Sequence, residues 1–259
     1  MLLLLGLAAG GLGGLLGIGG SIVMIPGMAV LLGSNQHLYQ AAAMIVNVAV
    51  AAPAAWRHWR AGAVRMDVLA AMLPAAIVFI IIGVAASDRI ESAWLERIFG
   101  VFLVYVIVVN IARLVTKKPE PADRTDGVSR VRAGAVGSIT GFMAGLLGVG
   151  GGVVTVPLLQ RFVHLPLRQC IATSSAVMVL TATVGAVQKN WTLSHHINEQ
   201  APGVMLQVTD SLLIAGLLIP TAIIGGVLGA GLTHRMPLTW LRIVFIALLC
   251  AAAVRMLGR

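Results

Sequence analysis

The chain has 259 residues, of which 59% are hydrophobic and only 10% are charged. Soluble domains carry about 25% charged residues, so this composition excludes an ordinary soluble protein and predicts an all-α polytopic membrane protein. The formal net charge of +9 would suggest nucleic-acid binding in a soluble protein. In a membrane protein we expect it to reflect cytoplasmic loops rich in Lys and Arg, so no nucleic-acid partner is predicted.

The first half of the chain, residues 1–116, is predicted to form one membrane repeat. It opens with an apolar helix at 2–16, which we expect to belong to the fold because no basic residue precedes it as in a leader. After a break comes a short apolar arm containing Pro26, which either kinks this helix or begins it. Three segments long enough to cross a bilayer follow, at 38–56, 68–86 and 98–115.

The second half, residues 133–259, repeats this plan after a polar linker at 117–132 that is predicted to be cytoplasmic. An apolar arm at 133–147 is followed by a break and a short arm at 153–163. Spanning segments are predicted at 170–187, 212–233 and 238–254. The prediction is therefore two homologous repeats with about eight hydrophobic helices, in which a Gly/Pro-broken or re-entrant segment comes first in each repeat.

One motif occurs at corresponding places in the two halves. Residues 14–26 read GLLGIGGSIVMIP and residues 145–157 read GLLGVGGGVVTVP, with eight of thirteen positions identical and an offset of 145 − 14 = 131. Hydrophobic segments interrupted by Gly and Pro at corresponding places of two halves point to the binding site of a transporter. Late in each half the offset becomes 146, which predicts a loop insertion of 146 − 131 = 15 residues near 192–203.

Other glycines are spaced for helix packing. A ladder of glycines four apart precedes each break and predicts that another helix packs closely against it. These glycines are Gly6, Gly10, Gly14, Gly137, Gly141 and Gly145. A further group, Gly225, Gly226 and Gly229, is compatible with a homodimer contact and equally with internal packing.

Two membrane topologies satisfy the positive-inside rule. If the arm before each break spans the bilayer, there are eight crossings and the repeats run parallel. If each break is the tip of a re-entrant hairpin, each half crosses three times and the repeats are inverted. A helix of thirteen residues reaches only about 20 Å, short of the ~30 Å hydrocarbon core, which favours the hairpin.

The glycines at the two breaks are predicted to bind a small anion. Backbone that leaves the helix exposes N–H groups, which survive in a membrane only where protein or a water-filled cavity covers them. Where the chain re-enters a helix, these groups converge and the helix dipole adds positive potential. The alternative is that the glycines only permit tight turns and close packing. The predicted binding residues are Gly17, Gly19, Gly20, Ser21, Gly148, Gly150, Gly151 and Gly152.

Polar side chains inside spans provide further candidates. Thr173, Ser174 and Ser175 can donate hydrogen bonds to a substrate or bond back to the carbonyls one turn earlier. Asn47 lies in mid-span, where its amide needs a partner, either on another helix or on a substrate. We include all four residues in the predicted site.

Basic residues and possible metal ligands give weaker evidence for a binding site than the glycine breaks do. His58 and Lys189 end equivalent helices, where each is expected to be a solvated interfacial base or to draw anions toward the site. The group of His195, His196 and Glu199 lacks further ligands, so no metal or cofactor is predicted. No Asp, Glu, Lys or Arg is evident in mid-span, which argues against a proton relay of buried carboxylates and against an enzyme.

The motif at 148–157, GVGGGVVTVP, together with Ala172-Thr173-Ser174, resembles the sulfite exporter TauE/SafE (TSUP) family. The first half departs from the pattern, because Ser21 replaces the third glycine and residues 41–43 are alanines. The resemblance implies a multi-pass carrier of the bacterial inner membrane that exports small anions, such as sulfite or organosulfonates like sulfoacetate.

We therefore predict a secondary transporter of small sulfur-containing anions. The two breaks would form a midplane site, and one repeat would move against the other. The alternatives are an anion channel and a non-transporting membrane subunit that assists an enzyme. The predicted partners are the anion and the lipid bilayer, while a coupling ion and a homodimer are left open.

Overall fold

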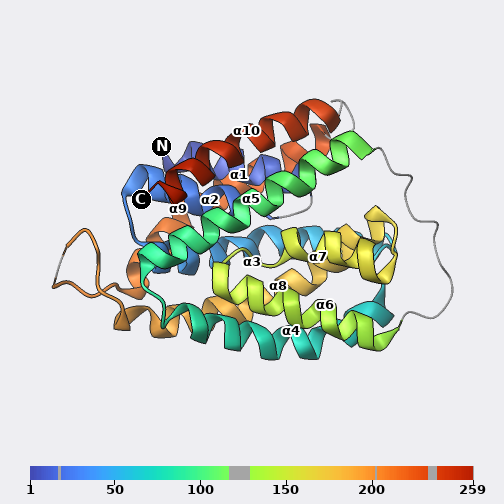
Figure 1. Ribbon diagram of the computed structural model, residues 1–259, viewed down its shortest axis with the longest axis horizontal. Coiled ribbons are helices and arrows are strands. Elements are labelled where there is room, and N and C mark those ends of the chain that lie inside the picture. Colours follow the sequence, from blue (N-terminus) through green and yellow to red (C-terminus); the bar gives the residue numbers. More distant parts are fainter. Residues whose placement is uncertain (17–18, 117–128, 202, 233–237, 259) are drawn as a thin grey trace.

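A computed structural model describes residues 1–16, 19–116, 129–201, 203–232 and 238–258. Within these residues the chain is nearly all helix, which confirms the predicted all-α membrane fold (Figure 1). The first half contains α1 (Leu2–Leu16), α2 (Ser21–Leu32), α3 (Gln36–Arg60), α4 (Met66–Ser87) and α5 (Ser92–Thr116). The second contains α6 (Arg130–Leu147), α7 (Gly152–Leu158), α8 (Leu167–Thr192), α9 (Val208–Leu232) and α10 (Leu238–Leu257).

Five described helices are long and apolar enough to cross a membrane. The qualifying segments are Gln36–Arg60, Met66–Ser87, Ser92–Val109, Leu167–His195 and Val208–Leu228. By contrast α2, and α7 with the π-helical turn Leu159–Val163 that continues it, have 12 residues each. Twelve residues of α-helix are about 18 Å long, well short of the hydrocarbon core.

Each glycine break is the tip of a helical hairpin. In the first hairpin, a Cβ added to Gly13 of α1 would lie 2.9 Å from the backbone nitrogen of Gly20, and one added to Gly27 of α2 would collide with Leu5. In the second, the hydroxyls of Thr140 and Thr155 lie 3.2 Å apart across α6 and α7. The arms of each hairpin are therefore antiparallel.

Glycines let the first arm of each half pack on a helix of the other half. A Cβ added to Gly10 of α1 would collide with the backbone of Ala222 in α9, and one added to Gly141 of α6 with that of Ala76 in α4. The ladder thus packs helices closely, as predicted, and Figure 1 shows α4 and α6 side by side. Gly225 likewise packs on α1, so this glycine serves internal packing.

Further contacts between the halves place α3 on α9 and α4 on α8, and two more join helices of corresponding position. α3 packs on α8, and α5 packs on α10. α3 and α8 run through the middle of the molecule in Figure 1, between the α4–α6 pair and the elements above them.

The structure decides one open alternative and shifts one predicted boundary. Pro26 is the sixth residue of α2, so it does not begin the helix, and the missing N–H falls in the helix interior. α6 begins at Arg130, three residues before the predicted start of the second repeat. The rest of the predicted linker, residues 117–128, lies outside the described residues.

Candidate functional site

The tips of both hairpins meet the amide of Asn47, in the middle of α3. A Cβ added to Gly19 would lie 3.5 Å from Asn47 Oδ1, and one added to Gly150 would lie 2.7 Å from Asn47 Nδ2. The two glycines have positive φ angles of 79° and 68°, a backbone conformation that glycine adopts at low cost. The missing side chains therefore let both breaks turn sharply against one buried amide.

Met178 of α8 lies at the same meeting point. Its sulfur would be 3.2 Å from a Cβ on Gly19 and 3.1 Å from one on Gly150. Met178 follows Asn47 by 178 − 47 = 131 residues, the offset that relates the two motifs. The hairpin tips therefore lie beside the middle of α3 and α8, the geometry that the re-entrant alternative requires. Sequence reasoning missed Met178, although this offset from Asn47 could have revealed it.

Several polar atoms around the tips lack partners. Asn47 is fully buried, and neither its Nδ2 nor its Oδ1 has a hydrogen-bond partner among the described residues. The hydroxyls of Ser21, at the start of α2, and Ser174, one turn before Met178 on α8, are also buried and unpartnered within that part of the chain. Buried polar atoms are nearly always bonded to protein or to ordered water. These atoms can therefore bind a small polar ligand or water.

The other break residues shape the tips. Gly148 ends α6 with a φ of 73°, and its N–H donates to the carbonyl of Ala144 at 2.9 Å. Gly151, with a φ of 84°, precedes Gly152, the first residue of α7. Gly20 precedes Ser21 in the same way at the start of α2. The predicted site residue Gly17 lies outside the described residues.

The three predicted hydroxyl residues of α8 are in different environments. Ser175 Oγ donates to the carbonyl of Ile171 at 2.8 Å, which is the back-bonding alternative. Thr173 Oγ1 accepts a hydrogen bond from the backbone N–H of Arg65 at 3.1 Å and so holds the segment between α3 and α4. Ser174 alone among the three has a buried hydroxyl without a partner in the described chain.

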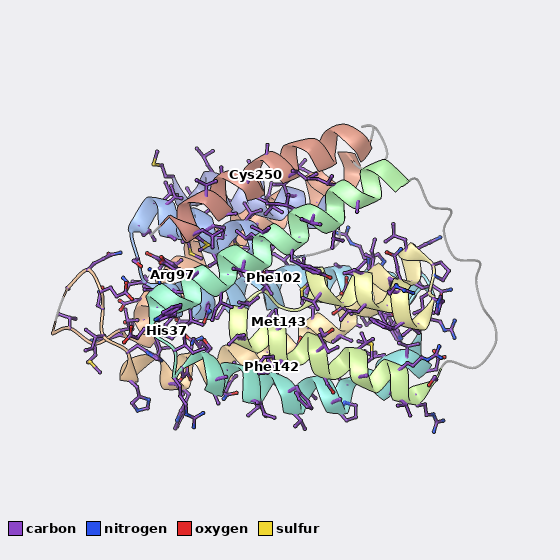
Figure 2. The ribbon with its side chains drawn as sticks, viewed as in Figure 1. His37, Arg97, Phe102, Phe142, Met143 and Cys250 are labelled. Carbon is purple, nitrogen blue, oxygen red and sulfur yellow. The ribbon has the colours of Figure 1, made fainter. Side chains whose placement is uncertain are left out.

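Lys189 is not the solvated or anion-attracting base that we predicted. Its side chain has 0% exposure, in the last turn of α8, and its Nζ contacts three groups. It lies 2.8 Å from His37 Nδ1 on α3, 2.9 Å from Ser87 Oγ and 2.6 Å from Asp88 Oδ1 at the end of α4. Figure 2 labels His37 toward the left end of the molecule. Sequence reasoning missed this cluster because its members come from segments far apart in the chain. His58, at the equivalent helix end, is half-buried.

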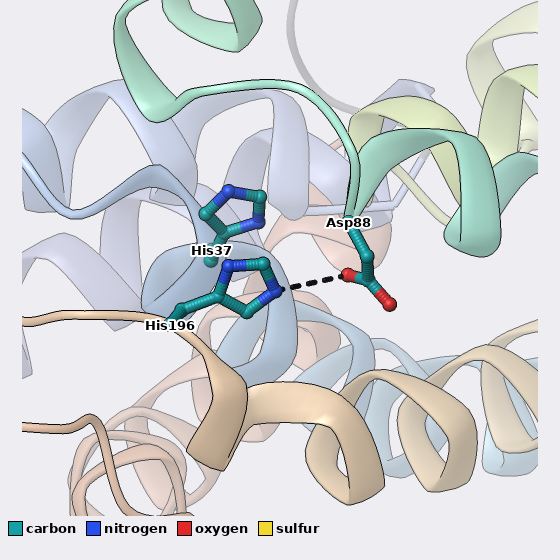
Figure 3. Close-up of side chains that lie close together, drawn as sticks. All are labelled: His37, Asp88 and His196. Atoms are coloured by element: carbon teal, nitrogen blue, oxygen red, sulfur yellow. Dashed lines mark ion pairs between the residues drawn. The ribbon is translucent and has the colours of Figure 1, made fainter.

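His196 joins this cluster and not the predicted group with His195 and Glu199, both of which are exposed. Its Nε2 lies 3.4 Å from Asp88 Oδ1. Figure 3 marks this pair with a dashed line. The ligand atoms of His37, Asp88 and His196 lie within 4.8 Å of one another, a spacing that a metal ion could bridge. However, the Lys189 ammonium already occupies both His37 Nδ1 and Asp88 Oδ1, so an ion would have to displace it.

Apolar helices that break at corresponding places in two halves and meet at a buried polar point are typical of one class of membrane protein, the transporters. The chain belongs to the sulfite exporter TauE/SafE family, whose model matches residues 2–256. It is therefore a multi-pass membrane protein of a transporter family, consistent with the bacterial inner membrane.

Named relatives agree with this class. The chain is 28% identical over 99% of its length to a protein of Paramagnetospirillum magneticum named "Probable membrane transporter protein MamO", of which it covers 44%. It therefore spans less than half the length of that relative. It is 24% identical over 91% of its length to the Bacillus subtilis protein YunE, named in the same way, and covers 89% of it. No solved structure significantly matches the chain.

Proposed function

We propose that the protein is a secondary transporter that exports small sulfur-containing anions, such as sulfite or organosulfonates like sulfoacetate. The observation that carries the proposal is the amide of Asn47 between Gly19 and Gly150, which has no partner among the residues that the structure describes. The family description, sulfite exporter, supports the substrate class and the direction.

The groups around Asn47 suit a small anion. The Asn47 amide and the hydroxyls of Ser21 and Ser174 supply neutral hydrogen-bond donors. The first N–H groups of α2 have no intrahelical carbonyl to bind, and the positive end of the helix dipole lies there. Hydrogen-bond donors without a fixed positive charge bind an anion and still release it, which a carrier must do in every cycle.

Alternating access is proposed to come from one half moving against the other. The site lies between α3 and α8, which pack on each other, and one hairpin tip reaches it from each half. Movement of α3 against α8 would shift the two tips relative to each other and open the site to one side of the membrane at a time. Transporters built from repeats use such a movement of one repeat against the other around a midplane site.

Thermal stabilisation of the purified protein tests the substrate class. The panel is sulfite, thiosulfate, sulfate, sulfoacetate, taurine and chloride. A ligand that binds only the folded state, at 100 times its Kd, adds about 2.7 kcal/mol to the free energy of unfolding. Selective stabilisation by a sulfur-containing anion is expected, and a protein that responds to none of these anions would overturn the proposal.

The position of the site is tested with Gly150→Leu. The leucine side chain would fill the space against Asn47 and Met178, so anion binding and transport in proteoliposomes should be lost while the protein still reaches the membrane. Normal transport by this variant would show that the anion binds elsewhere.

A further inference from the structure

The buried ammonium of Lys189 has a complete set of partners. An ammonium has three N–H donors, and His37, Ser87 and Asp88 each receive one. A buried charge is tolerated only when it is paired and hydrogen-bonded. Asp88, whose side chain is 15% exposed, is the counter-ion. With neutral imidazoles nearby, the cluster carries no net charge.

Two imidazoles complete the cluster. The rings of His37 and His196 are stacked, with centroids 3.8 Å apart and an interplanar angle of 14°. His37 Nε2 lies 3.1 Å from the carbonyl of Ile90, which can only accept, so Nε2 carries the hydrogen. His37 Nδ1 is then the acceptor for Lys189. A proton added to Nδ1 would therefore break the hydrogen bond between Lys189 and His37.

The loop insertion holds His196 in this position. The N–H of Leu206 donates to the His196 carbonyl at 2.9 Å, which joins the two sides of the loop. Asn35, just before α3, accepts from the N–H of Glu199 at 3.0 Å and donates to the side chain of Asn198 at 3.0 Å. The insertion is thus tied to the start of α3, and His196 is placed over His37.

The charges that face His37 come from three segments. They are Lys189 of α8, Asp88 at the end of α4 and His196 of the insertion. On the α5 side, Glu96 is bonded instead to Ser34 at 2.6 Å. A first proton on the imidazole pair would bring the cluster to a charge of +1; on His37, burial and Lys189 oppose this proton and Asp88 favours it. A second would place two positive rings in contact, so the cluster is suited to one proton at a time.

A chain of hydrogen bonds leads from the cluster to the second glycine break. Ser87 Oγ, which accepts from Lys189, donates to Gln40 Oε1 at 2.9 Å. Gln40 Nε2 donates to the carbonyl of Leu146 at 3.1 Å, in the last turn of α6. Gly148 packs directly on Gln40. Displacement of Lys189 would therefore loosen the bonds that hold the end of α6, next to the tip that reaches Asn47.

We propose that His37, Asp88, Lys189 and His196 form a proton-binding site that couples proton movement to anion transport. The inference rests on the proposed function. The cluster is ten residues from Asn47 along α3, about 15 Å at 1.5 Å per residue. One bound proton offsets the charge of one monovalent anion, so the two cross the membrane together and the sum of their gradients sets the direction. Ser87 and Gln40 transmit the displacement of Lys189 to the second glycine break.

Proton binding itself is tested without any anion. ¹⁵N-histidine NMR of the purified protein follows the imidazoles between pH 5 and 8, and single His→Gln variants assign His37 and His196. The expected result is that one ring of the pair gains a proton in this range and that Lys189→Met alters its titration. If neither ring changes protonation, the proton site is overturned, whatever the protein transports.

Coupling is tested in proteoliposomes with sulfite in mildly acidic buffer, where it is the monovalent hydrogensulfite ion. At one proton per monovalent anion, a gradient of one pH unit should sustain about a tenfold anion gradient. His196→Gln should abolish this accumulation but retain exchange of sulfite for sulfite, because the anion site is intact. The matched control is His195→Gln, an exposed neighbour in the same loop, which should accumulate like the wild type.

The outcomes separate the two proposals. Accumulation by His196→Gln equal to that of the wild type would overturn the coupling while leaving the transporter proposal in place. Failure of the wild type to accumulate sulfite on the pH gradient would do the same. If no anion of the panel is bound or exchanged, the proposed function fails and with it the coupling, while the NMR titration still decides whether the cluster binds a proton.

Discussion

Gly19 and Gly150 lie against the same two side chains, although 150 − 19 = 131 residues separate them in the sequence. A Cβ added to either glycine would lie within 3.5 Å of Asn47 and within 3.2 Å of Met178. Each also has a positive φ. The two halves of the chain thus contribute equivalent backbone turns to one buried point.

Gly150→Ala is expected to stop transport, and Gly62→Ala is its matched control. The φ angles of the two glycines are 68° and 66°, so alanine should cost a similar 1–2 kcal/mol of backbone strain, roughly, at either position. Nothing lies within 4 Å of a Cβ on Gly62, whereas one on Gly150 meets Asn47. Anion binding by Gly150→Ala equal to that of Gly62→Ala would contradict the site.

Asn47→Leu should remove anion binding without destabilising the protein. Its amide has no partner among the described residues, and a buried unsatisfied polar group costs about 1–3 kcal/mol. An apolar side chain of similar size should therefore keep or raise the unfolding temperature measured without anion.

Gln40→Met, on the same helix, is the control for Asn47→Leu. The buried Gln40 amide is bonded to Leu146 and Ser87, so this substitution should lower the unfolding temperature. If Asn47→Leu lowers it as much as Gln40→Met does, Asn47 has a structural partner, and the argument for a ligand there fails.

Ser174→Ala and Ser175→Ala should differ in anion affinity. The Ser174 hydroxyl is buried and unpartnered in the described chain, while that of Ser175 bonds back to Ile171. Loss of one hydrogen bond to a charged ligand should raise the Kd roughly tenfold or more, since such bonds contribute about 1.5–3 kcal/mol. Titration of both variants with the stabilising anion measures this, and equal Kd values would remove Ser174 from the site.

Lys189→Met should destabilise the protein strongly because it leaves Asp88 without its counter-ion. Removing one partner of a buried ion pair costs about 3–5 kcal/mol, and the partial exposure of Asp88 places the expected value at the lower end of this range. The double variant Lys189→Met/Asp88→Asn should recover part of the loss. Denaturant unfolding of the two single variants and the double variant measures the coupling, and additive effects would contradict the pair.

Acid should reduce the stabilisation that Asp88 provides. Burial raises the pKa of its carboxyl, but the contact with His196 and the charge and hydrogen bond of Lys189 outweigh burial and hold the pKa well below its usual value. The ionised carboxylate therefore stabilises the fold above about pH 4, and this contribution is lost as the pH falls toward the folded-state pKa. The stability difference between wild type and Asp88→Asn should shrink between pH 6 and 3, and a constant difference would refute the assignment.

The sequence by itself determined the membrane class, the helices and the places where they break. Composition, apolar length and glycine spacing are local properties, so they predicted the spans of α3, α4 and α9 to within a few residues. The 131-residue offset also marked Gly19 and Gly150, because a repeated motif is visible without knowledge of any contact.

Only the tertiary structure decided which polar groups are neighbours. Lys189 ends an apolar helix and looks interfacial in the sequence, yet His37 and Asp88 reach its Nζ from two other segments. His196, from a further segment, contacts both of these partners. Likewise, nothing in the sequence distinguishes Ser174 from Ser175. Whether a serine hydroxyl donates to the carbonyl one turn earlier depends on which polar groups the neighbouring helices place beside it. Contacts between distant segments determine burial and charge pairing, and local pattern does not encode them.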